Sequence, residues 1–402
     1  MPRLPNILWI VTTQWRAAAF GYAGDPNART LHLDALAAES VNHAQAVTPH
    51  PFGPFARAAL LTGVRSPGNG VRDYFDPLPT AAHTIAHTLR ARGYTTAFFG
   101  KWHLWKRDPA APLVGEAHAR IVVPPEARGG FEFWEGFDGG FLLNDPWLHG
   151  TRLEQPRKFA GYQSDVVCER AAGWMAEKNY RQTGAWFAVV SLEAPHPPYD
   201  APAAGVAARE PREVILPANV PRGGAAEVQA RRELAGYYAH VEATDRAIGQ
   251  LLADADRDET LVVFTSVHGD MHGAHGLFRK GWPHEESVRV PLLVRAPGEA
   301  PRRSDAAISL LDLPALMLAG IENGESKIEN RFSQISMPSV VALPHQCDRA
   351  WRGVRTRTRK LVLNADGSPW LFYDLASDPL EMKNLAADPA RAAEIAQLRP
   401  LT

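Results

Sequence analysis

The sequence contains little cysteine and no excess of charge of either sign. Two cysteines, Cys168 and Cys347, occur among 402 residues, too few for a disulfide framework. Lysine and arginine together number 43 against 44 aspartates and glutamates, a formal net charge of −1, and no long run of one sign occurs. Because nucleic-acid binding needs a concentrated basic surface, we do not expect nucleic acid as an obligate partner.

Long hydrophobic runs are absent as well. The apolar run Asn6–Val11 is too short for the core of a signal peptide, and no stretch approaches the length of a membrane span. We therefore expect no membrane association and a cytoplasmic protein. With 45% hydrophobic residues, the chain is long enough for one large α/β domain and a smaller one.

Strand and helix patterns alternate through most of the chain. Continuous apolar runs typical of buried parallel strands occur at 7–11, 95–99, 186–192 and 260–265. Helical periodicity occurs at 31–40, 57–62, 84–92, 164–178 and 225–253. This alternation predicts an α/β fold with a doubly wound, mainly parallel sheet flanked by helices.

Three segments of the chain are predicted to differ in organisation. Residues 1–322 form the α/β domain, 323–345 a polar linker, and 346–402 a small C-terminal α+β subdomain with an antiparallel sheet around the turn at 364–367. Within the first, residues 105–159 are rich in glycine, proline and aromatics without a clear period. They are predicted to form a long irregular insertion, either a surface loop or a wall that contacts substrate.

The stretch His50–Gly63 reads H-P-F-G-P-F-A-R-A-A-L-L-T-G. From Arg57 onward it resembles the helix that follows the nucleophile in the sulfatase family of the alkaline phosphatase superfamily. Further motifs similar to that family occur in order over nearly the whole chain: Asn6-Ile-Leu, Gln14-Trp-Arg, Leu33-Asp, Gly100-Lys-Trp-His, Pro195-His-Pro-Pro-Tyr, His268-Gly, His275-Gly, Lys280-Gly, Glu285-Glu-Ser-Val-Arg-Val-Pro, Tyr373-Asp-Leu and Asp378-Pro.

The resemblance implies a nucleophile and a divalent cation, usually calcium, that this chain does not supply in the family's way. The family's nucleophile is a serine or a cysteine oxidised to formylglycine, and Gly53 stands at that position. Acidic metal ligands of the family are replaced by Thr13-Gln14 and by Val267-His268, which lack the negative charge that hard-cation binding requires. We therefore expect no metal ligands, no bound metal and no other cofactor.

The rest of the family's pocket is retained. The resemblance implies that the six cationic and imidazole residues Arg57, Lys101, His103, His196, His268 and Lys280 converge on one site. Arg57 and Lys280 are expected to bind an anionic group, with Gly53 and Thr13 lining the space left by the missing nucleophile and ion. Lys101, His103, His196 and His268 are the candidate catalytic residues, because imidazoles and a lysine crowded by other cations can transfer protons near neutral pH.

A second type of site competes for part of this region. His268, Asp270, His272 and His275 are spaced closely enough to suggest a transition-metal site with imidazole ligands. The resemblance explains His268 and His275 without a metal, so we favour the anion pocket.

Three functions are compatible with the sequence. We favour an enzyme that uses acid–base chemistry on an anionic small molecule, without metal or covalent nucleophile. The alternatives are a sulfate, phosphate or phosphonate ester hydrolase with an atypical site, and a non-catalytic anion-binding protein. The preference rests on selective loss, since the metal ligands and the nucleophile are replaced together whereas the cations and imidazoles remain.

Overall fold

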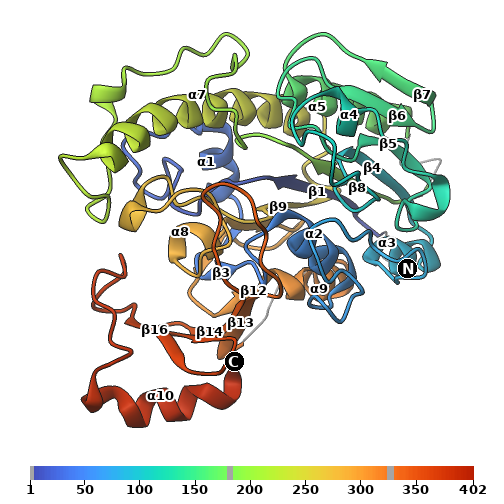
Figure 1. The fold of residues 1–402 in the computed structure, drawn as a ribbon. Helices are drawn as coiled ribbons and strands as arrows, with labels where there is room; N and C mark the ends of the chain where they lie inside the picture. Colours follow the sequence, from blue (N-terminus) through green and yellow to red (C-terminus); the bar gives the residue numbers. More distant parts are fainter. Residues whose placement is uncertain (1–3, 179–183, 324–329) are drawn as a thin grey trace.

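A large mixed sheet with helices on both faces forms the body of the protein (Figure 1). The computed structural model describes residues 4–178, 184–323 and 330–402. Its ten-stranded sheet has the order β11-β2-β10-β9-β1-β8-β4-β5-β6-β7. The four central strands are mutually parallel: β9 (Thr260–Ser266), β1 (Asn6–Thr12), β8 (Trp186–Ser191) and β4 (Thr95–Lys101). The predicted doubly wound α/β fold is confirmed.

The edges of the sheet consist of shorter strands. Beyond β9 lie β10 (Leu292–Arg295), β2 (Val41–His43) and β11 (Arg302–Ser304). Beyond β4 lie β5 (Phe133–Phe137), β6 (Trp147–Gly150) and β7 (Leu153–Lys158). These last three fall within 105–159, where an irregular insertion was predicted, so part of that segment extends the sheet instead; α4 (Glu116–Ala119) also lies there.

Two apolar layers bury the sheet. One face packs against α1 (Leu31–Ala38), α5 (Gln163–Glu177) and α7 (Ala225–Ala253). The other packs against α2 (Gly53–Thr62), α3 (Ile85–Ala91) and α9 (Leu313–Asn323). The strands β1 and β9 are buried along their whole length, as a sheet covered on both faces requires.

The central strands end level with one another. Register pairs Thr12 with Ser266 and Gly100 with Ser191. Gly100 has φ +91°, and a Cβ there would lie 2.1 Å from the Ser191 carbonyl oxygen, so only glycine allows β4 and β8 to approach so closely. The side chains that follow these strands are therefore brought to one edge of the sheet.

A small antiparallel sheet forms the C-terminal part, below the main sheet in Figure 1. Its strands are β13 (Phe332–Met337), β14 (Trp351–Thr356), β15 (Arg359–Asn364) and β16 (Pro369–Asp374), followed by α10 (Ala392–Leu398). The predicted C-terminal α+β subdomain is thus present. Strand β13 lies inside the predicted linker 323–345, of which residues 324–329 fall outside the described residues.

Two short strands, β3 (Ala46–Val47) and β12 (Ile308–Ser309), pair separately, and α8 (Glu285–Val288) precedes β10. Among the described residues, no helix combines the length and the apolar character that crossing a membrane requires.

Candidate active site

A cavity of about 870 Å³ opens at the carboxyl edge of the central strands. Thr13 follows β1, Lys101 ends β4, and His196 and His268 follow β8 and β9. Seven of the eight predicted site residues line this cavity: Thr13, Gly53, Lys101, His103, His196, His268 and Lys280. Residues that lie far apart in the sequence therefore form one site.

Arg57 lies behind the cavity wall rather than in it. Its guanidinium donates to the Thr13 hydroxyl at 2.8 Å, the Lys101 carbonyl at 3.0 Å and the Ser191 hydroxyl at 2.6 Å. Burial lowers its pKa to about 10. These bonds tie together the ends of β1, β4 and β8, so in this structure Arg57 positions the wall of the cavity.

Gly53 is the first residue of α2 and faces the imidazole of His103. A Cβ at Gly53 would lie 2.9 Å from His103 Nδ1, closer than real Cβ atoms approach, so the ring occupies the space next to the missing side chain. His103 has φ +60°, a left-handed conformation that costs a non-glycine residue energy. Its Nδ1 is buried without a hydrogen-bond partner among the described residues.

Lys101 forms a buried ion pair with Glu193. Its Nζ lies 2.5 Å from Glu193 Oε1, and both side chains are almost fully buried. Burial lowers the pKa of Lys101 to about 8, although Glu193 opposes that shift. Sequence reasoning did not select Glu193; its only signal was a single acidic residue directly after an apolar strand.

Lys280 is held by a polar network beside His196. Its ammonium donates to Gln14 Oε1 and lies 2.9 Å from His196 Nε2. Burial, and secondarily the charge of Lys101, lower its pKa to about 7. Because Lys280 donates to Nε2 and His196 Nδ1 lies 2.8 Å from the Pro197 carbonyl, the arrangement fits a neutral ring with its proton on Nδ1.

Burial holds the imidazoles of His103, His196 and His268 in the neutral form. It is the largest cause that lowers each pKa well below the usual value, and neighbouring cations lower each further. His268 Nδ1 lies 2.9 Å from the Gly269 carbonyl. Its Nε2 is buried without a partner among the described residues. The cavity thus presents neutral imidazoles beside two amines that titrate near neutral pH.

The resemblance places the family's calcium at the edge of the cavity beside Gln14. The side chains at that edge are not arranged to bind a hard cation. Gln14 Oε1, the oxygen that could coordinate it, already accepts from the Lys280 ammonium. The nearby carboxylate of Asp270 accepts from Gln14 Nε2 at 2.5 Å and from the Tyr199 hydroxyl at 2.6 Å. Gln14 and Tyr199 were not predicted as site residues, and Asp270 was considered only as part of a transition-metal group; their shared network becomes evident in three dimensions.

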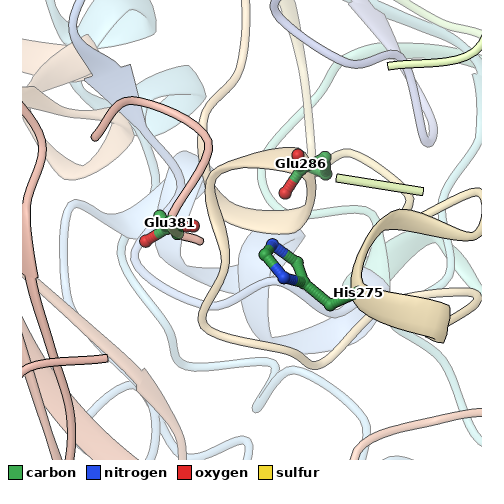
Figure 2. Close-up of side chains that lie close together, drawn as sticks. All are labelled: His275, Glu286 and Glu381. Carbon is green, nitrogen blue, oxygen red and sulfur yellow. The ribbon is translucent and has the colours of Figure 1, made fainter. Parts of the chain in front are cut away.

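A different group of side chains could hold a metal ion. His275, Glu286 and Glu381 each offer one ligand atom, and these atoms lie within 4.8 Å of one another (Figure 2). Burial raises the pKa of Glu381 to about 7. Within the described part of the chain, the His268–Asp270–His272–His275 site considered from the sequence is not formed, because only His275 belongs to such a group.

Comparisons with known proteins extend over almost the whole chain. The sequence model of the family described as Sulfatase matches residues 5–320. An ulvan-active sulfatase of Formosa agariphila is 33% identical over 418 residues, covering 96% of this chain and 78% of that protein.

Solved structures share the fold. The yidJ protein of Bacteroides fragilis, a candidate sulfatase, superposes with a TM-score of 0.86 at 24% identity, covering 99% of this chain and 95% of the other. A phosphonate monoester hydrolase of Agrobacterium radiobacter gives 0.73 at 21% identity, covering 98% and 94%.

The prediction that the protein has no metal ligands and no cofactor is wrong. Proteins of the matching family normally use a divalent metal and formylglycine. The structure also contains a group of side chains suited to a metal, His275, Glu286 and Glu381. The sequence analysis considered the edge next to Gly53 and a group around His268 that included His275, but not Glu286 or Glu381, which come from segments whose proximity to His275 the sequence does not show.

Proposed function

The chain belongs to the sulfatase family, and on that basis we propose that it is an enzyme acting by acid–base chemistry on an anionic small molecule, a sulfate, phosphate or phosphonate ester. The observation that carries the proposal is the set of buried, proton-exchanging groups around one cavity, Lys101, His103, His196, His268 and Lys280. Acid–base catalysis requires groups whose pKa lies near the working pH, and both lysines meet that condition.

Lys280 is the principal anion-binding group of this proposal. Its ammonium reaches the cavity, and its hydrogen-bond partners among the described residues are neutral, Gln14 and His196. Lys101 is neutralised by Glu193 and contributes less net charge. An anion bound beside Lys280 raises the pKa of that lysine, since an opposite charge favours the charged form.

Gly53 offers no side chain to form a covalent intermediate, so water is the nucleophile. The neutral His103 imidazole accepts a proton from a water molecule as the water oxygen bonds to sulfur or phosphorus. The bond to the ester oxygen breaks, and the leaving oxygen takes a proton from the Lys280 ammonium. His103 then releases the proton that it accepted to solvent, and solvent returns a proton to Lys280, while His196 Nε2 holds the Lys280 amine in place.

The test is turnover of aryl sulfate, phosphate and phosphonate monoesters by the purified chain. We expect His103→Ala, His196→Ala and Lys280→Ala each to lower kcat/KM by about 100-fold or more, the usual contribution of a positioned acid or base. Lys106→Ala is the matched control, because Lys106 is exposed on the loop that follows His103. Unchanged turnover in the His103→Ala and His196→Ala variants would contradict the proposed roles.

A second candidate function is anion binding without turnover. It is favoured by the internal pairing of the cations, with Lys101 held by Glu193 and Lys280 held by Gln14. Binding of inorganic sulfate that is lost in Lys280→Met, together with no turnover of any of the three ester classes, would favour this function over catalysis.

A further inference from the structure

His275, Glu286 and Glu381 come together from three separate segments outside the cavity. His275 lies in the turn η3 (Ala274–Gly276) after β9, Glu286 in α8, and Glu381 in the chain after β16. Their potential ligand atoms lie within 4.8 Å of one another, and Figure 2 shows the three side chains converging. We propose that they bind one divalent transition-metal ion, with Zn²⁺ as the ion that fits best.

The charges around this cluster are unevenly distributed. Arg289, Arg355 and Lys360 all lie against Glu285, at 3.6, 3.0 and 2.7 Å. Of these cations only Lys360 also reaches Glu381, at 2.6 Å. Among the described residues no cation lies within ion-pair distance of Glu286. Because a carboxylate removed from water is costly without a positive partner, the Glu286 carboxylate favours a bound cation.

Unpaired buried oxygens point to the same place. Glu286 Oε2 is buried and has no hydrogen-bond partner among the described residues. Asn219, only 3% exposed, directs its amide into the cluster: its Nδ2 lies 2.6 Å from Glu286 Oε1 and 3.3 Å from His275 Nε2. The Oδ1 of the same amide is also buried and has no hydrogen-bond partner in the part of the chain that the structure describes. A cation would satisfy Glu286 Oε2, and rotation of the Asn219 amide would supply a further oxygen.

The donor set selects the type of ion. One imidazole and two carboxylates suit zinc better than calcium, which prefers an all-oxygen shell. In a tetrahedral zinc site with bonds of about 2.1 Å, the ligand atoms lie about 3.4 Å from one another. Side-chain rotations that move these atoms by about 1 Å would bring the three ligands to that distance. The His275 ring is already oriented by a hydrogen bond with the Leu380 carbonyl, the kind of support that fixes a metal-bound imidazole.

The position of the ion gives it a structural role. His275 and Glu286 flank Lys280 in the sequence, and Glu381 belongs to the C-terminal part of the chain. The ion therefore joins the segment that carries Lys280 to the C-terminal sheet. This inference does not depend on the proposed function, because none of the three ligands lines the cavity.

The test is metal binding by the whole chain after removal of metal with a chelator. Titration with Zn²⁺ should show one equivalent bound, with a rise in Tm. Glu286→Gln and His275→Asn should weaken the binding by at least about tenfold, the effect of losing a supporting group and a lower bound for a ligand. His83→Asn, an exposed histidine on another surface, is the matched control and should bind as the wild type does.

Two outcomes would overturn the site. The first is the absence of Zn²⁺ binding in the millimolar range. The second is binding that survives Glu286→Gln and His275→Asn but is lost in His268→Ala, which would place the ion at the cavity edge. Because a variant can misfold, anomalous diffraction from a wild-type crystal grown with Zn²⁺ provides an independent answer: a peak between the three side chains supports the site, and a peak only elsewhere refutes it.

Discussion

The His103 ring occupies the space at the start of α2 that a side chain at position 53 would need. With no Cβ at Gly53, the His103 ring fills the position beside the backbone, bordered by the rings of Tyr74 and Phe141 at 5.8 and 6.1 Å between centroids. The imidazole is therefore held by its neighbours rather than by hydrogen bonds at Nδ1.

We expect Gly53→Ala to lower the free energy of unfolding by about 1–3 kcal/mol, because overpacking forces a buried side chain from its position. Urea denaturation provides the measurement. In a His103→Ala background, Gly53→Ala should lower the free energy of unfolding much less. That result would show that contact with the His103 ring causes the loss. Gly173→Ala is the matched control: nothing lies within 4 Å of a Cβ there, so this helical site should gain stability. Equal costs in the two backgrounds would contradict the assignment.

The pKa of Lys280, about 7, predicts how anion binding depends on pH. The charged groups that act on its ammonium are Lys101, Asp270, Arg279 and Glu193. The protonated lysine attracts an anion and the neutral amine does not, so affinity for sulfate should be highest below pH 7 and fall as the pH rises through 7 to 8.

Calorimetric titration with sulfate at several pH values measures this dependence. His103, His196 and His268 are neutral throughout that range and cannot produce the change. In Lys280→Met the step near pH 7 should disappear. Affinity that stays constant from pH 6 to pH 9 would show that Lys280 does not bind the anion.

For single residues, the sequence predicted which side chains line the cavity better than it predicted their hydrogen-bond and ion-pair partners. The resemblance to the sulfatase family implied that Lys101 and His196 belong to one site, and the parallel strands that precede them bring both to one edge of the sheet. The sequence could not show that Glu193 neutralises Lys101, or that Arg57 turns inward to Thr13. Those contacts depend on side-chain directions in the packed protein.

Among the elements, α1 and α7 are joined by an unusual cap. The first turn of α1 leaves backbone N–H groups without partners inside the helix. Asp245, from the middle of α7, accepts from His32 N at 3.1 Å and from Leu33 N at 2.8 Å. A side chain of one helix thus performs the role of an N-cap residue for another.

We expect Asp245→Ala to lower the free energy of unfolding by about 1–3 kcal/mol, since buried donors lose their acceptor. Chemical denaturation monitored by circular dichroism measures the change. Asp254→Ala is the matched control, because Asp254 is exposed at the end of the same helix and should change stability little. A smaller loss for Asp245→Ala than for the control would disprove the capping role.

Prediction of the elements depended on their periodicity. The apolar pattern at 225–253 matches α7 residue for residue. The segment 105–159 was predicted to be irregular because it has no clear period. Its strands are short and are interrupted by glycines that allow close backbone contact, which hides the strand pattern. Gly150, with φ +143°, would place a Cβ 1.8 Å from the Trp134 carbonyl oxygen. That requirement comes from the neighbouring strand, which the local sequence does not describe.

For the whole molecule, alternation of strands and helices was sufficient to predict the architecture, since the connection rules leave few arrangements. The boundary between its parts is harder to predict. Strand β13, within the predicted linker, pairs along its length with β14, and its polar alternating sequence resembles a loop until that partner is known. Division of the chain at 322 and 345 therefore remains a prediction.

The low pKa values of Lys101 and Lys280 also make the protein selectively modifiable. Near neutral pH an exposed lysine is almost entirely protonated and unreactive toward electrophiles, whereas an appreciable fraction of these two buried amines is free base. Both side chains line the cavity. A small activated ester or isocyanate at pH 7 would therefore tag these two positions before any surface lysine, and a covalent ligand or fluorescent reporter could be installed there without engineering the chain.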